Sequence, residues 1–311
     1  MAQGQGSSVS LRVGKETSFG VTGDTSYEIP FSPTLDFKET QALNDSSVIR
    51  GTRNMDRSFL GFKAVDGSLS IPLDTKSAPK FLEGFFNAPV DVDNEDGTYT
   101  HTFTVANTAI PSYFVEVAHL DLGLYYLHNG IKMNNFDLSF GGDGELLMNI
   151  SALGQKTTKA DAEVVAPTAL TNNLKFGQFQ ASITGATNVK DLSLSYTNNL
   201  DGGQYVIGDG GVRGEIPLGM VGVSFSFTAL FENDDLLADA RNNVDKALSI
   251  SLTNGTNSIT FDLAETVLTP TGVTVDSPQG LTQSFDGTAF WRAGTANSSL
   301  VVTVVNDSET V

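Results

Sequence analysis

Carboxylates and glycines supply the few clusters in this sequence that could do chemistry. The segment Asp91–Gly97 (DVDNEDG) resembles the start of a calcium-binding loop. Such a loop needs a glycine at its sixth position and a bidentate glutamate at its twelfth. This sequence has Asp96 and Thr102 at those positions, so an acidic hairpin loop is the interpretation that the residues favour.

Other reactive residue types lack the spacing that a site requires. The three histidines, His101, His119 and His128, do not show the paired spacing of a zinc site and are expected on the surface or in hydrogen bonds. The glycine-rich segment Gly208–Gly214 lacks the spacing of a dinucleotide-binding loop, which favours a turn. With 36 Asp and Glu a glycosidase-like carboxylate pair stays open, but nothing singles one out. We therefore expect no catalytic residues, no cofactor, no metal and no enzyme activity.

Charge and composition narrow the partners further. The 311 residues carry 18 Lys and Arg against 36 Asp and Glu, a formal charge of −18, and no Cys. Tight DNA binding requires clustered cations that release counterions, so specific nucleic-acid binding and docking to an anionic membrane are not expected. Passive passage of DNA is not excluded by this argument. The absence of a long apolar run and of a signal-like N-terminus leads us to expect a protein made in the cytoplasm.

Short segments that alternate apolar and polar residues predict strands over most of the chain. Two helices are expected, Thr75–Phe86 with Pro79 in its first turn and Asn233–Asn243 with an acidic start. The expected turns are Asp66-Gly67, Asp96-Gly97, Asn129-Gly130, Asp143-Gly144, Asp201-Gly202-Gly203 and Asn254-Gly255. The sequence therefore predicts a mainly β fold with two short helices.

The two helices sit at corresponding places in a repeat of strand, helix and four strands. The predicted matches are 67–73 with 222–229, 75–86 with 233–243, 99–105 with 247–253, 113–118 with 258–264, 135–140 with 283–290, and 146–153 with 299–305. We accordingly expect a flexible N-terminal arm over residues 1–10 and a first domain over 11–156. A linker over 157–180 and a second domain over 181–311 complete the predicted organisation.

An ordered series of segments in the first half resembles a known family. The series is Gly14–Gly20, Ile29–Ser32, Leu35–Glu39, Ser47–Gly51, Val65–Pro72, Tyr99–Phe103, Pro111–Val117 and Asn129–Lys132. In this order it is similar to the major tail tube proteins of long-tailed, non-contractile (siphovirus-like) bacteriophages. The resemblance is clear over about residues 10–155 and architectural beyond.

The resemblance implies a fold, a function and partners. Tail tube proteins are β-sandwiches or barrels with a flanking helix, and they form rings that stack into a hollow tube through which genome DNA enters the host. This chain would then carry two tandem tube-type domains, each with one short helix, in trimeric, pseudo-hexameric rings. Its partners would be further copies of itself and the tape measure, tail terminator and tail-tip proteins. It would be part of the virion tail, assembled in the bacterial cytoplasm, with no membrane contact and no specific DNA contact.

Two sets of residues are candidates for these roles. A channel for DNA needs small polar and acidic groups that repel phosphates. The candidate lumen face consists of Asp36, Lys38, Asp137, Ser139, Asp191, Ser193, Ser224 and Ser226. The segment Gln41–Ala64 is too long for an ordinary hairpin loop and joins basic to apolar residues, which suits docking onto an acidic neighbouring ring. Its candidate contact residues are Arg50, Arg53, Met55, Arg57, Phe59, Leu60 and Lys63.

Other functions stay open at this point. A secreted or surface β-sandwich adhesin or carbohydrate-binding module fits the Gly-, Asn- and Thr-rich composition, although the single Trp gives little for a sugar platform. A tail terminator or tail-end protein would share the tube fold. An outer-membrane barrel is disfavoured by the two helices and the linker.

Overall fold

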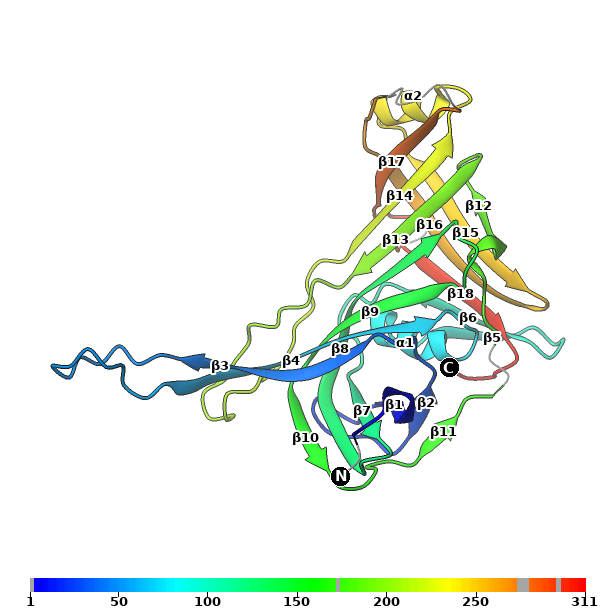
Figure 1. The fold of residues 1–311 in the computed structure, drawn as a ribbon. Helices are drawn as coiled ribbons and strands as arrows, with labels where there is room; N and C mark the ends of the chain where they lie inside the picture. Colours follow the sequence, from blue (N-terminus) through cyan, green and yellow to red (C-terminus); the bar gives the residue numbers. More distant parts are fainter. Residues whose placement is uncertain (1–2, 172–173, 273–279, 295–297) are drawn as a thin grey trace.

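Antiparallel strands make up most of the chain, as the alternating sequence pattern predicts (Figure 1). The computed structural model describes residues 3–171, 174–272, 280–294 and 298–311. Within these residues it has eighteen strands, two α-helices and two short 3₁₀ helices. No helix in this part of the chain has both the length and the apolar composition needed to cross a bilayer.

Seven strands form the sheet that crosses the middle of the molecule, here called sheet 1. Its hydrogen-bonded order is β3 (Leu35–Asn44), β4 (Phe59–Pro72), β9 (Leu147–Gly154), β8 (Leu124–Phe140), β13 (Val189–Thr197), β14 (Gly222–Leu230) and β17 (Thr282–Ala289). All neighbours are antiparallel. Strands from both halves of the sequence therefore share one sheet, joined where β8 pairs with β13.

Two further sheets complete the fold. Sheet 2 runs β12 (Ala181–Thr184), β15 (Lys246–Asn254), β16 (Asn257–Leu268), β18 (Val301–Asn306), β6 (Tyr99–Thr104) and β5 (Val90–Asp93). Sheet 3 runs β11 (Pro167–Ala169), β2 (Ser26–Ile29), β1 (Val9–Lys15), β7 (Tyr113–His119), the first part of β8 and β10 (Lys156–Ala160). Strand β8 thus belongs to sheets 1 and 3.

The first helix fills the space between the sheets. Helix α1 (Ser77–Phe86) begins where Asp74 Oδ1 accepts hydrogen bonds from the backbone N–H groups of Lys76 and Ser77. Pro79 lies in its first turn, as predicted, where a missing N–H costs nothing. Its rings Phe85 and Phe86 contact an aromatic cluster completed by Phe103, Phe136 and Tyr196. These rings join sheets 1 and 2 in one apolar core.

The second helix, α2 (Asp235–Arg241), is shorter than the predicted Asn233–Asn243 and lies at the far end of the second half (Figure 1). Its N-cap position is Asp234 and its last turn holds Arg241, charges that suit the two ends of a helix. Leu237 and Ala240 are its buried residues, so its apolar face is narrow.

The two halves repeat one pairing scheme. In the first half the order is β1–β7–β8–β9–β4–β3, with β10 also on β8. In the second it is β12–β15–β16–β17–β14–β13, with β18 also on β16. The corresponding strands follow one another in the same order along the sequence, with a helix after β4 and after β14.

This scheme corrects the element matching that the sequence order predicts. The matches of 67–73 with 222–229 and of the two helices hold, since β4 and β14 occupy equivalent places. After the helices the matching is displaced, because β5 and β6 form a hairpin that has no counterpart in the second half. Strands β7, β8, β9 and β10 therefore correspond to β15, β16, β17 and β18.

Two of the predicted turns are wrong, because their glycines serve strands. Gly67 lies inside β4, where a Cβ would stand 2.1 Å from the Phe37 ring, so the glycine admits that ring. Gly130 lies inside β8 with φ of +66°, where the strand passes from sheet 3 to sheet 1. A glycine within a strand commonly marks such a bend or close approach. The other four predicted turns lie between strands.

The predicted flexible N-terminal arm and the predicted linker contain regular structure where they are described. In the N-terminal arm, Gly6–Ser8 is a 3₁₀ helix and Val9 and Ser10 belong to β1. In the expected linker, 157–180, lie most of β10, all of β11 and the 3₁₀ helix Gln178–Gln180. Residues 1–2 and 172–173 of these segments lie outside the described residues. The division into two domains stays a prediction.

The aromatic cluster behind sheet 1 predicts a large loss of stability on truncation. Phe136→Ala should lower the free energy of unfolding by about 3–5 kcal/mol, since it leaves a cavity among fully buried rings. Chemical denaturation of the unassembled protein measures this change. Phe179→Ala, at a side chain that is 76% exposed, is the control and should change stability by less than about 0.5 kcal/mol. Equal effects of the two substitutions would contradict the assignment of the core.

Candidate functional site: a polar sheet face and a projecting arm

All eight residues of the candidate lumen face lie on one face of sheet 1. Residues directly opposite each other in an antiparallel pair point to the same side. Ser193 stands opposite Ser139 on β8 and Ser226 on β14. The face also contains Ser68, Ser70, Asn149, Ser151, Asn135, Ser195, Thr197, Thr228, Ser284, Asp286 and Thr288. The sheet thus presents a continuous polar surface formed by both halves of the chain.

Short side chains give this polar face its chemistry. Its hydroxyls hydrogen-bond to one another, as in Ser193 with Ser226 at 2.7 Å. Its one predicted cation, Lys38, pairs with Asp36 at 2.6 Å, so that charge is neutralised locally. The alternate residues of the same strands are apolar and largely buried. That the polar face lines a channel stays a prediction.

The segment Gln41–Ala64, expected as a loop, is instead the outer part of a β-hairpin. Strands β3 and β4 pair out to Asn44 and Phe59, well beyond the body of the protein. Figure 1 shows them as an arm that projects to one side. We call residues 41–64 the arm and residues 45–58, which connect the strands, its tip. Continued strand pairing explains how so long a segment stays extended away from the core.

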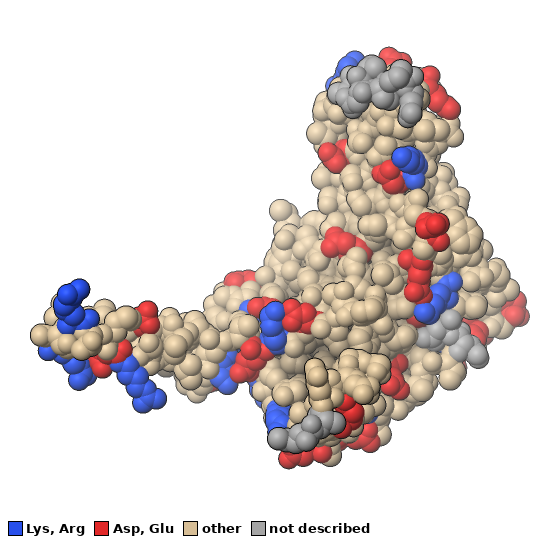
Figure 2. Space-filling view, viewed as in Figure 1, with Lys and Arg blue, Asp and Glu red and all other residues tan. Residues whose placement is uncertain are grey.

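The tip joins cations to exposed apolar side chains. Basic residues gather there in Figure 2. Arg50 pairs with Asp56 at 2.7 Å, whereas Arg53 and Arg57 form no ion pair within the described chain. Ile49 is 92% exposed and Met55 is 69% exposed. Such residues are poorly placed in solvent unless a partner covers them.

The predicted contact residues outside the tip differ in their surroundings. Phe59 and Leu60 are exposed on the distal part of β4, beside the tip. Lys63 lies nearer the body and pairs with Glu39 at 3.1 Å across the hairpin. It therefore holds the two strands of the arm together, and the sequence prediction of a docking role for it gains no support from this contact.

A second long connection, residues 198–221 between β13 and β14, runs along the root of the arm. The Phe62 and Tyr205 rings stack with centroids 4.3 Å apart. Buried Arg213 donates hydrogen bonds to the carbonyls of Val65 and Gly154 and pairs with Asp66. For the glycine-rich part of this connection, Gly208–Gly214, the sequence predicts only a turn. The lone arginine among glycines was the signal that could have suggested an anchor.

A buried histidine lies beneath the root of the arm. His128 Nδ1 is 2.8 Å from the Thr157 hydroxyl, and its ring lies 5.7 Å from the Phe37 ring of β3. Its Nε2 has no hydrogen-bond partner among the described residues. Burial lowers the pKa of His128 to about 4, although the charge of Glu39 acts in the opposite direction. The imidazole is therefore neutral in the folded protein at neutral pH.

The clusters that first suggested chemistry serve the fold. The acidic segment Asp91–Gly97 belongs to the hairpin of β5 and β6, and buried His101 bonds to Asp91 and Asn306. Among the described residues, no group of His, Asp or Glu has the arrangement of a metal site.

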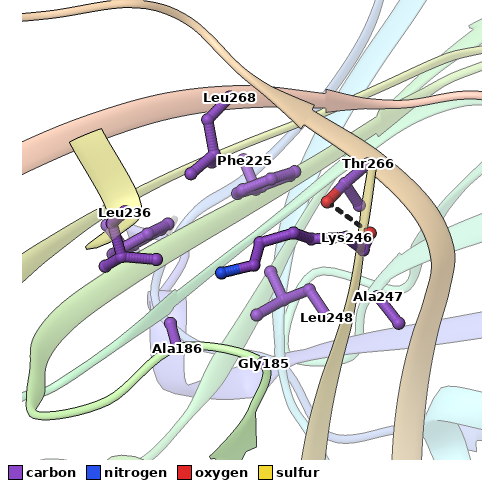
Figure 3. Close-up of a pocket in the computed structure, with 10 residues that line it drawn as sticks. Gly185, Ala186, Phe225, Leu236, Lys246, Ala247, Leu248, Thr266 and Leu268 are labelled. Atoms are coloured by element: carbon purple, nitrogen blue, oxygen red, sulfur yellow. Dashed lines mark hydrogen bonds between the residues drawn. The ribbon is translucent and has the colours of Figure 1, made fainter. Parts of the chain in front are cut away.

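The cavity drawn in Figure 3 lies between α2 and the sheets and measures about 10 Å³, room for at most about one water. Its lining is mostly aliphatic and aromatic. The Thr266 hydroxyl there bonds to the Lys246 carbonyl, and the Lys246 ammonium pairs with Asp239. Such a space is a packing defect and cannot hold a substrate.

Comparison with known families finds a match that covers nearly the whole chain. A family model described as phage tail tube protein matches residues 6–289. The match therefore includes most of the second half, where the sequence resemblance was architectural only. No curated protein matches this chain.

The state of His128 predicts a specific pH dependence. Its folded-state pKa of about 4 lies below the ordinary value of 6.5, so protonation favours the unfolded chain. The stability that the neutral ring provides is fully present above pH 6.5 and is lost as the pH falls towards 4, by about 3 kcal/mol in total. The variant His128→Gln has no titratable group at this position, so the stability of the wild type should fall relative to that of the variant on acidification. Denaturation curves from pH 7 to 4.5 measure this, and a constant difference would contradict it.

Proposed function

The chain belongs to the phage tail tube protein family, and from this premise we propose that its copies assemble into rings that stack into the hollow tail tube. The tube is the conduit through which genome DNA is ejected into the host. The observation that carries the proposal is the family match across both halves, together with a pairing scheme that occurs twice. A tail tube protein is a structural component of the virion tail.

A ring of three chains follows from the repeated scheme. If each half is one tube domain, three chains supply six similar units and the ring is a pseudo-hexamer. Within sheet 1 the two units join where β13 pairs with β8. By the repeat, β3 corresponds to β13, and among the described residues β3 pairs only with β4. The edge of β3 that does not face β4 is therefore available to the second half of a neighbouring copy. By the same repeat, β16 corresponds to β8, so the partner of β3 would be the end of β16 near Leu268.

Edge pairing of this kind would close sheet 1 around the ring. An unpaired strand edge is a template for association, and a closed ring leaves none exposed. The polar face would then line the channel. Its carboxylates, including Asp36, Asp137 and Asp191, would repel phosphates and keep the passing DNA from adhering.

The arm suits contact between successive rings. It projects from the body and presents cations in a protein whose formal charge is −18. Attraction between such a tip and an acidic neighbour speeds association and fixes the orientation of the partners. Further partners by this proposal are the tape measure, the tail terminator and the tail-tip proteins. Assembly would take place in the cytoplasm of the host bacterium.

Electron microscopy of the purified protein tests the proposal directly. Concentrated protein is expected to form hollow tubes of stacked rings, and a reconstruction should resolve six similar lobes per ring from three chains. The polar face of sheet 1 should surround the channel. Six chains per ring would refute the pseudo-hexamer, and single rings that never stack would instead indicate a terminator or tail-end protein.

Reversing the charge of the tip should stop tube growth. The variant Arg50→Glu, Arg53→Glu, Arg57→Glu is expected to lower tube yield about tenfold or more, since each 1.4 kcal/mol of lost contact energy costs a factor of ten in affinity. Circular dichroism should show an unchanged fold, because the tip contributes nothing to the core.

The control reverses three cations on the body, Lys159, Lys175 and Arg241, and changes the net charge by the same amount. It should leave tube yield close to that of the wild type. Unimpaired tubes from the tip variant would refute the docking role of the arm.

A further inference from the structure

The hairpin of β5 and β6 is a second projecting element that the core does not explain. Strand β5 pairs only with β6 among the described residues, so its other edge is free. Its four residues are all exposed, with Val90 at 68% and Val92 at 53%. A strand with an open edge and exposed valines is an unfinished surface.

Unpaired carboxylates surround this edge. Asp93, Glu95 and Asp96 form no ion pair with any described residue. Hydrogen bonds from the hydroxyl and the backbone N–H of Thr98 lower the pKa of Asp96 below its ordinary value, so this group stays ionised. The hairpin therefore offers an aliphatic strip beside concentrated negative charge.

The tip of the arm has the complementary character. Arg53 and Arg57 are cations without an ion pair in the described chain, and they stand beside exposed Ile49 and Met55. Within the chain the two surfaces cannot meet, because the arm and the β5–β6 hairpin project from opposite sides of the body (Figure 1). Figure 2 likewise shows basic residues at the arm tip and acidic residues at the opposite end.

A contact between opposite ends of identical molecules is heterologous, and such contacts build rings or helical filaments. The number of arms and of hairpins per chain also agrees with such a contact. The fold scheme occurs twice, but among the described residues the strand-paired arm and the β5–β6 hairpin each occur once, since the equivalent connection of the second half, residues 198–221, lies along the root of the arm instead of extending as a hairpin. Every copy therefore has one tip to offer and one hairpin to receive a tip.

We propose that the β5–β6 hairpin is the acceptor for the arm tip of a second copy of this chain. In this contact Val90 and Val92 cover the exposed aliphatic groups of the tip, and Asp93, Glu95 and Asp96 pair with its arginines. The inference rests on the proposed tube assembly and names the surface that the arm meets.

A charge swap tests this pairing. The variant Asp93→Arg, Glu95→Arg, Asp96→Arg should lower tube yield about tenfold or more, as the tip reversal does. Combining it with Arg50→Glu, Arg53→Glu and Arg57→Glu in one chain should restore tubes, because the two surfaces are again complementary. The matched control combines the same tip reversal with Asp24→Arg, Asp143→Arg and Glu232→Arg, exposed carboxylates elsewhere on the body, and should restore nothing.

Cross-linking supplies a second measurement that does not depend on the charge-reversed variants. The chain has no native cysteine, so Met55→Cys protein and Val92→Cys protein can be mixed and treated with a short bismaleimide. A covalent dimer of the two proteins is expected. Leu230→Cys, 51% exposed on β14, replaces Val92→Cys as the control and should give at least about tenfold less product.

The outcomes separate the two claims. Tubes from the wild type that are lost on tip reversal, without rescue by the swap and without the specific cross-link, overturn the acceptor but leave tube assembly intact. If the wild-type protein forms no tubes, or if reversing the charges of the tip leaves the tube yield unchanged, the result counts instead against the proposed function. Rescue together with the cross-link establishes the acceptor.

Discussion

Within sheet 1 the two halves of the chain meet along one strand pair, β8 with β13, and the two-sided character of this sheet depends on the contact. Asp137 stands opposite Ser195, and Leu138 stands opposite Leu194. The polar face therefore continues across the junction, and so does the apolar face behind it. A slip of one residue would turn leucines outwards and serines into the core. Burial on one side thus fixes the register that keeps the other side polar across the junction.

The core behind this junction reinforces the same alignment. Phe136 and Tyr196 are register partners, and their rings stack with centroids 5.2 Å apart. Buried Asn198 donates hydrogen bonds to the carbonyls of Phe85 and Met133, which ties the end of β13 to α1 and β8. Buried polar groups are costly unless paired, so these bonds tolerate few other arrangements. Aromatic packing and directional hydrogen bonds therefore select one relation between the halves.

The strands and the first helix were predictable from local patterns, because burial of one face makes apolar residues recur with a period of two in a strand and of 3.6 in a helix. All eight candidate face residues followed from the same periodicity, and they do share one side of sheet 1. Strand partners could not be predicted in this way. Gly67 and Gly130 read as turns because a sequence shows only that a glycine is needed, and both are needed inside strands. The β5–β6 hairpin displaced the predicted matching of the two halves, because the sequence does not show which strands pair with each other.

The candidate contact surfaces were harder to predict from the sequence than the core. The basic tip of the arm stood out because cations are scarce in this chain, whereas the segment Asp91–Gly97 was interpreted only as an acidic hairpin loop and was given no role. Acidic residues are common here, so one cluster carries little information until its free strand edge and exposed valines are known. The repeat of the pairing scheme also limits which contacts the surface can make. In the proposed ring, the features that occur twice would serve contacts between neighbouring units, while the arm tip and the β5–β6 hairpin would bind each other once per chain. In the proposed tube, this difference between the two halves would give the stack of rings its direction.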